Sequence, residues 1–153
     1  MELCLAELAV SDPKSYGQHQ RGVPYGPGWR SKCDLCFGTG PNWDWAIEAK
    51  LLRFLGDNGK PNGNMLMHIL SPYSQDRSAL TDCTKLAQSP IARRKAILIF
   101  GYHHEDWPLE PAIVAFETLA SSRVRLGPRL SAVTGTLVHP VHALGQVFAW
   151  ELW

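Results

Sequence analysis

The chain has 153 residues, 45% of them hydrophobic, which fits one globular domain with a proper core. No apolar run approaches the roughly 20 residues of a membrane helix, and residues 1–10 lack a basic leader and a small-residue cleavage site, so we expect a soluble, cytoplasmic protein with no membrane partner. A formal net charge of +1 excludes no class of partner, because phosphate binding depends on where basic residues cluster.

The first 30 residues predict little regular structure beyond one short helix. Residues 2–10 are mostly apolar and predict a helix that ends at Asp12 and Pro13. Residues 15–29 are rich in glycine, proline and polar side chains, which indicates a loop with at most one short strand.

A β-hairpin is predicted where two alternating segments follow each other, residues 33–37 and residues 43–52. In the second segment apolar side chains alternate with largely polar ones, so Glu48 and Lys50 should point to the same face, roughly 7 Å apart. The first segment alternates in the same way and has Asp34 on its polar side. The residues between the two segments are typical turn formers.

The hydrophobic pattern also predicts how the two strands pair. Pairing Phe37 with Trp43 puts all the apolar residues on one face and Asp34 opposite Ala46. Asp34 is then a diagonal neighbour of Glu48, about 7–8 Å away at the backbone. A slip of one residue would place the two acids on different faces. We therefore expect the Asp34 and Glu48 carboxylates to converge within about 6 Å, close enough for one metal ion to bridge them.

A loop and a second helix are predicted next. Residues 56–64 are dense in turn formers and predict a mobile surface loop. Residues 76–88 predict a helix capped by Ser74 or Asp76, with this apolar stripe: Ala79, Leu80, Cys83, Leu86 and Ala87. Three charged residues lie off the stripe and are expected on a solvated helix face, with phosphate contact as the alternative: Arg77, Asp82 and Lys85.

The C-terminal half predicts a central strand, a helix and two more strands. Residues 95–102 form a continuous apolar run typical of a buried strand, parallel to the one before the helix. Residues 109–122 predict a helix with Pro111 in its first turn and these residues facing inward: Ile113, Phe116, Leu119 and Ala120. Residues 130–138 and 146–153 read as strands that extend the sheet or form the surface of a homodimer.

Asp34, Glu48 and Lys50 together have the chemistry of a metal-dependent hydrolase. Two carboxylates offer the hard oxygen ligands that Mg²⁺ prefers, and a metal-bound water ionises more readily. The Lys50 ammonium can orient the attacking water and stabilise the charge that develops on a phosphoryl group. The alternative is that the three residues form the solvated face of an amphipathic hairpin.

The arrangement of Asp34, Glu48-Ala49-Lys50, a helix and a further buried strand resembles the PD-(D/E)xK nuclease superfamily. The resemblance covers most of the chain as an order of elements and three positions as a motif, while Cys33 stands where the motif has proline. It implies that Asp34 and Glu48 hold Mg²⁺, with Mn²⁺ as a substitute, and that Lys50 assists the nucleophile. It also implies a further acid from the first helix, Glu7 or Glu2.

Other clusters of reactive residues have weaker patterns. Cys33 and Cys36, with Cys4 and Cys83 elsewhere, could be read as a zinc or redox site. A spacing of three along a strand points the two sulfurs to opposite faces, so we expect buried, unpaired thiols without metal. Residues 103–106 resemble a metal cluster in composition but are expected in a surface loop, and His139 and His142 flank a turn proline; neither segment is expected to be functional.

We therefore predict a single α/β domain over residues 1–153, with a mixed central β-sheet flanked by helices and a restriction-endonuclease-like core. The predicted function is Mg²⁺-dependent endonucleolytic hydrolysis of DNA phosphodiester bonds. One alternative is a catalytically inactive module that uses the same fold to bind nucleic acid or protein. Another is a zinc-binding structural protein, which requires the cysteines to converge.

Overall fold

The computed structural model describes residues 14, 17–135 and 137–153 of the chain. The helix predicted over residues 2–10, with Glu2, Cys4 and Glu7, lies outside these ranges and stays a prediction. Within them, no helix is long and apolar enough to cross a membrane.

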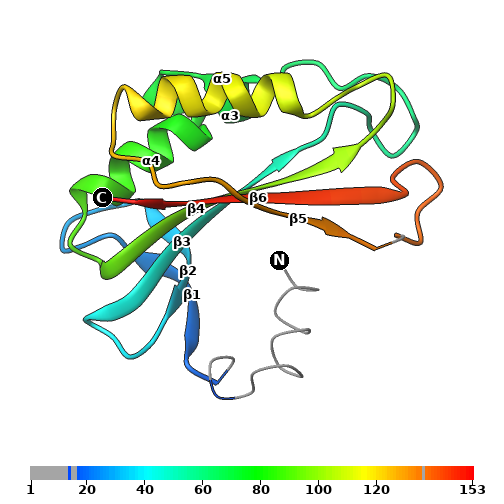
Figure 1. Cartoon of the computed structure of the whole chain (residues 1–153). Coiled ribbons are helices and arrows are strands. Elements are labelled where there is room, and N and C mark those ends of the chain that lie inside the picture. Colours follow the sequence, from blue (N-terminus) through cyan, green and yellow to red (C-terminus); the bar gives the residue numbers. More distant parts are fainter. Residues whose placement is uncertain (1–13, 15–16, 136) are drawn as a thin grey trace.

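The described residues form one mixed α/β domain around a six-stranded sheet (Figure 1). The strand order is β1-β2-β3-β4-β6-β5; β3 and β4 run parallel, and all other neighbours run antiparallel. The mixed sheet is thus confirmed, with β4 inside it as predicted for the apolar run. The strands are β1 (His19–Pro24), β2 (Lys32–Phe37), β3 (Trp43–Leu52), β4 (Ala92–His103), β5 (Leu130–Thr134) and β6 (Leu144–Leu152).

The described helices lie together on one face of the sheet (Figure 1). The connection from β3 to β4 contains α3 (Met67–Leu70), a 3₁₀ turn η1 (Ser74–Asp76) and α4 (Ala79–Gln88), and α5 (Glu110–Ser121) follows β4. The predicted start of the second helix is corrected, because α4 begins after Ser78, whose Oγ accepts a hydrogen bond from the Thr81 N–H at 3.2 Å.

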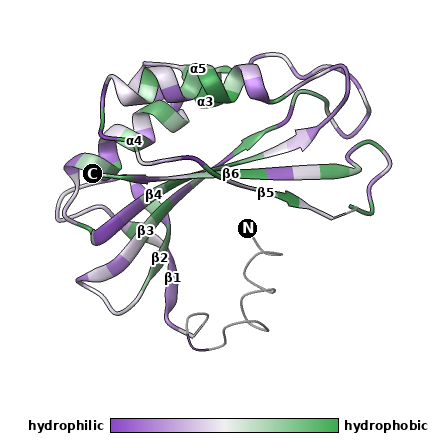
Figure 2. Cartoon of the chain, viewed as in Figure 1, coloured by the Kyte–Doolittle hydropathy of each residue, from purple (hydrophilic) through white to green (hydrophobic). Residues whose placement is uncertain are grey.

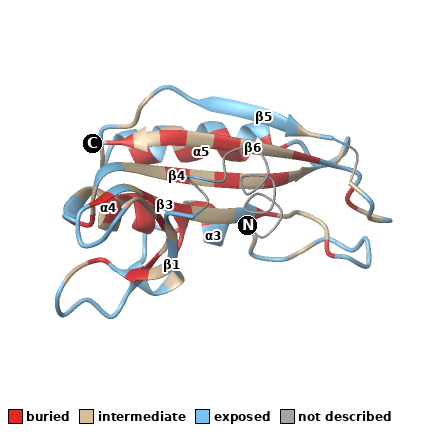
Figure 3. Ribbon diagram, turned by 90° about the horizontal axis from the view of Figure 1, so that it is seen from below, coloured by how far each residue is buried: buried red, intermediate tan, exposed pale blue. Residues whose placement is uncertain are grey.

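The core fills the space between the helices and the sheet. Hydrophobic residues are frequent in α5 and in the central strands (Figure 2), and buried positions recur along the same elements (Figure 3). The largest fully buried apolar side chains include Leu80, Leu86, Ile97, Ile99, Ile113, Phe116, Phe148 and Trp150. Leu119 was expected among them but is 41% exposed, because it lies on the outer side of α5.

The hairpin forms as predicted, but its register differs by two residues. Phe37 pairs with Trp45 and Leu35 with Ile47, whereas the apolar pattern predicted Phe37 opposite Trp43. A shift of two residues leaves every side chain on the same face, so alternation cannot distinguish the two registers. When the observed pairing is continued by one residue, Asp34 lies opposite Glu48. The two residues are then closer than in the diagonal arrangement that the sequence predicted.

The polar side of β3 faces the helices, which corrects the alternative of a solvated face. Ala46 and Leu52 on this side are fully buried, and Glu48 between them is only 3% exposed. On the other side of the strand, Trp45 is half-buried and Leu51 is 42% exposed. The carboxylate of Glu48 is therefore enclosed between sheet and helices.

Close packing between β4 and the start of α5 gives a test of this fold. A Cβ atom added at Gly101 would lie 2.6 Å from Leu109 Cδ1, and Leu109 is buried. We expect Gly101→Ala to lower the free energy of unfolding by about 1–3 kcal/mol in urea titrations. Gly63→Ala is the control, because no atom lies within 4 Å of the added carbon. Equal unfolding midpoints for the two variants would contradict this packing.

Candidate active site

Asp34 lies where the ladder between β2 and β3 stops. The last paired residues are Leu35 and Ile47. Two residues further along β3, the Ala49 N–H donates a 2.9 Å hydrogen bond to Asp34 Oδ2. The side-chain carboxylate thus takes the place of a backbone carbonyl. The Asp34 and Glu48 carboxyl groups lie within hydrogen-bonding contact. The structure therefore brings together the two acids that the sequence singled out.

Tyr25 is a member of this cluster that the sequence did not indicate. It follows β1, is fully buried, and donates its hydroxyl hydrogen to Glu48 Oε1. Its own carbonyl accepts a 2.6 Å hydrogen bond from Ser89 Oγ, at the end of α4. A tyrosine in a segment rich in glycine and proline has no periodic pattern to mark it as buried, so only the fold identifies its role.

Asp82 supplies a third carboxylate, from α4. Its side chain is 1% exposed, and it forms ion pairs through Oδ2 with Lys50 Nζ and through Oδ1 with Lys85 Nζ. The expectation of a solvated helix face for Asp82 and Lys85 is therefore wrong. The physical reason is that α4 packs on the side of β3 that carries Lys50, so a buried acid compensates the lysine charge.

The shared environment shifts the ionisation of these groups. Burial raises the pKa of Glu48 to about 9, and the neighbouring Asp82 and Asp34 carboxylates add to the increase, although the Tyr25 hydrogen bond opposes it. Burial pushes the pKa of Lys50 down, but the Asp82 carboxylate outweighs that effect, and the pKa lies above its usual value. At neutral pH Glu48 is thus protonated while Lys50 is charged.

The donor set of Asp34 and Glu48 fits a hard divalent cation. Mg²⁺ usually takes one or two protein carboxylates and completes its shell with waters and substrate phosphate. Burial, and then the neighbouring Asp82 and Asp34 carboxylates, disfavour the ionised form of Glu48, and a cation bound there would favour it. Among the described residues, no three or more histidine, cysteine, aspartate or glutamate side chains are arranged to hold a metal by themselves. Glu7, the predicted additional ligand, lies outside the described residues.

The cysteines within the described residues are free and buried, but the geometry of two of them corrects one expectation. Cys33 and Cys36 are both fully buried, and their thiols hydrogen-bond to each other, which raises the pKa of Cys33 and lowers that of Cys36. Regular alternation would separate the two thiols, and the Cys33 thiol also lies within hydrogen-bonding distance of the Leu35 and Ile47 carbonyl oxygens. Cys83 is also free and buried.

A second polar cluster joins three loops. His104 Nε2 lies 3.2 Å from His142 Nδ1, and His142 Nε2 lies 3.3 Å from Asp57 Oδ1. His142 is 1% exposed, and Tyr102 and His139 stack on its ring. Burial and the neighbouring His139 lower the pKa of His142. The cluster forms a hydrogen-bonded network that links the loop after β3 to the exit of β4.

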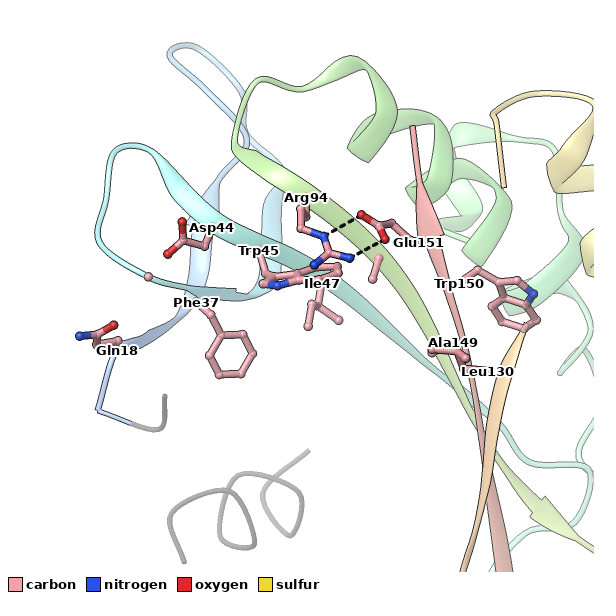
Figure 4. Close-up of a pocket in the computed structure, with 12 residues that line it drawn as sticks. Gln18, Phe37, Asp44, Trp45, Ile47, Arg94, Leu130, Ala149, Trp150 and Glu151 are labelled. Carbon is pink, nitrogen blue, oxygen red and sulfur yellow. Dashed lines mark hydrogen bonds and ion pairs between the residues drawn. The ribbon is translucent and has the colours of Figure 1, made fainter. Parts of the chain in front are cut away.

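A hollow of about 620 Å³ is lined by Trp45 and Ile47 (Figure 4), which alternate with Glu48 along β3 and so point to the other side of the strand. Arg94 lies over the Trp45 ring there, 4.0 Å from its centroid, and binds both carboxylate oxygens of Glu151 at 2.8 and 2.7 Å. Phe37 and Ile47 complete an apolar wall. The charged side chains of this hollow are already paired, so the carboxylate cluster is the better candidate for chemistry.

Comparisons with protein families, curated proteins and solved structures find no match for this chain. The nuclease resemblance therefore depends on the residues and on the order of the elements.

Coupling between Lys50 and Asp82 tests the site as described. We expect Lys50→Met and Asp82→Asn to interact in a double-mutant cycle by about 1 kcal/mol or more, because Asp82→Asn removes the ion-pair partner of Lys50 and Lys50→Met leaves Asp82 with Lys85 alone. The measurement is the free energy of unfolding in urea for the parent, both single variants and the double variant.

Arg93 and Asp44 provide the matched control pair, since their closest atoms are 3.8 Å apart and both side chains are more than half exposed. Their coupling should stay below about 0.5 kcal/mol. Equal coupling energies for the two pairs would show that the Lys50 to Asp82 contact is a surface interaction.

Proposed function

We propose that this protein is a Mg²⁺-dependent endonuclease that hydrolyses DNA phosphodiester bonds at Asp34, Glu48 and Lys50. The observation that carries the proposal is a buried Glu48 with a raised pKa, next to the half-buried Asp34 and to a lysine that stays charged. A purely structural cluster has no requirement for a second acid against Glu48. The order of β1, β2 and β3, then α4, then β4 parallel to β3, supports the resemblance to the PD-(D/E)xK superfamily.

Asp34 and Glu48 would hold the metal. When bound there, Mg²⁺ supplies Lewis-acid chemistry, lowering the pKa of a water and offsetting charge on the phosphoryl oxygens. Glu48 has to release its proton before it can act as a ligand, so metal affinity should rise with pH. The Tyr25 hydroxyl, donating to Oε1, would keep the carboxylate oriented while its other oxygen binds.

Lys50 would act on the water and the phosphate. Its ammonium has three donors, and the ion pair with Asp82 holds the side chain in one position. The remaining donors can orient the attacking water and stabilise the negative charge of the transition state. Asp82 is then a positioning residue, and Lys85 limits the excess negative charge around it.

A second candidate function is a catalytically inactive module of the same fold that binds nucleic acid or protein. The observation in its favour is that the cluster is already internally compensated: Lys50 and Lys85 pair with Asp82, and Glu48 shares hydrogen bonds with Tyr25 and Asp34. A cytoplasmic location remains a prediction. A homodimer also remains a prediction, supported by the exposed Leu130 and Val133 on edge strand β5.

Plasmid cleavage separates the two functions. We expect the parent protein to nick supercoiled DNA with Mg²⁺ or Mn²⁺ and to stop when EDTA is added. Asp34→Asn should lower the rate about 10²–10³-fold, since it removes a ligand charge at the reacting centre. Asp44→Asn is the matched control on the same hairpin, because Asp44 is exposed and should leave the rate unchanged. Equal rates for parent and Asp34→Asn would reject the nuclease proposal.

A further inference from the structure

A hollow of about 460 Å³ opens beside Lys50, next to the carboxylate cluster. It is bounded by the end of β3, by α3 and by the 3₁₀ turn that precedes α4. Its polar lining is mainly basic: Lys50, Arg53, His68 and Arg77, against the single acid Asp76. Lys50 belongs to both the hollow and the cluster, so a ligand in one lies adjacent to the other.

The charges of this hollow are only partly compensated. Asp76 accepts a hydrogen bond from Ser71 Oγ, and Arg53 pairs with Asp57 at 2.7 Å. Within the described part of the chain, the Arg77 guanidinium makes no hydrogen bond or ion pair, and its residue is exposed. The hollow therefore has a free guanidinium and a net positive lining.

The backbone at Arg77 is held in a conformation that side chains rarely adopt. Its φ and ψ angles are 48° and 43°, in the left-handed region that favours glycine. The surrounding turn is fixed by Ser71, which binds Asp76 through its hydroxyl and accepts the Ser78 hydroxyl at its carbonyl at 2.5 Å. Residues held in this region by the surrounding structure cluster at ligand sites.

We propose that this hollow binds the phosphate next to the one that is cleaved, with Arg77 as its main ligand and Arg53 at its side. A guanidinium binds phosphate oxygens through two parallel hydrogen bonds, and Lys50 connects the two phosphate positions. The substrate is then a DNA strand with consecutive phosphates rather than a mononucleotide or a small phosphodiester. This inference rests on the proposed function of the carboxylate cluster and deepens it.

Binding and cleavage by Arg77→Gln test the inference in the full-length chain. With a fluorescently labelled 12-nucleotide DNA strand and Ca²⁺ in place of Mg²⁺, we expect the anisotropy Kd to rise about tenfold. The slope of log Kd against log salt concentration should fall by about 1, as one phosphate contact is lost. In Mg²⁺, the loss of kcat/KM should be at least tenfold larger on the strand than on bis(p-nitrophenyl) phosphate, which has a single phosphate.

Arg123→Gln is the matched control, because Arg123 is exposed after α5 and away from the hollow, and it should leave Kd and the salt slope unchanged. An unchanged Kd and salt slope for Arg77→Gln would overturn the inference, as would equal losses on both substrates. If the parent cleaves neither substrate, the nuclease proposal fails, and the Kd and salt slope still decide whether the hollow binds a strand. Unfolding midpoints confirm that both variants fold.

Discussion

Burial of ionisable groups between β3 and α4 is the constraint on which the rest of this structure depends. Three carboxyl groups, Asp34, Glu48 and Asp82, gather with two ammonium groups, Lys50 and Lys85. Unpaired charges cannot be left in such a place without a large desolvation cost. The proton on Glu48 removes one negative charge, so that the remaining two carboxylates and two ammonium groups cancel.

The same count of charges supports the proposed metal and phosphodiester. If Glu48 loses its proton to bind Mg²⁺, the cluster acquires one net positive charge. A phosphodiester carries one negative charge and would restore neutrality. The buried site is thus balanced either with a proton and no substrate or with a metal and a substrate, and an ordinary solvated hairpin face has no such property.

The sequence predicted the sheet and the two faces of β3 better than it predicted what surrounds them. Alternation in β3 identified Glu48 and Lys50 on one side, and the apolar run identified β4, because both features are local. The register of β2 and β3 could not be predicted, because pairing Phe37 with Trp43 or with Trp45 leaves every side chain on the same face of the sheet. The burial of the polar side could not be read either, because it depends on Asp82, which belongs to a different element and contacts β3 only in the folded chain.

Two further differences between the predicted and the observed structure also come from contacts between residues far apart in the sequence. The Cys33 and Cys36 thiols lie in contact although regular alternation would separate them, beside the point where the Asp34 side chain accepts a hydrogen bond from the Ala49 amide. Tyr25 reaches Glu48 from a segment without periodic pattern, held there by Ser89 at the end of α4. In each case a side chain from a distant part of the sequence completes a hydrogen bond that the backbone leaves open.

The ionisation of Glu48 tests the account most directly, by carboxyl ¹³C NMR during a pH titration with Glu48→Gln to assign the signal. Without metal we expect a pKa of about 9 in place of the usual 4.5. A pKa raised on folding contributes stability that is fully present below pH 4.5 and is lost as the pH rises toward 9. Saturating Mg²⁺ should lower the pKa by at least about one unit, because the metal binds the ionised form. A pKa near 4.5 that does not respond to Mg²⁺ would contradict the account.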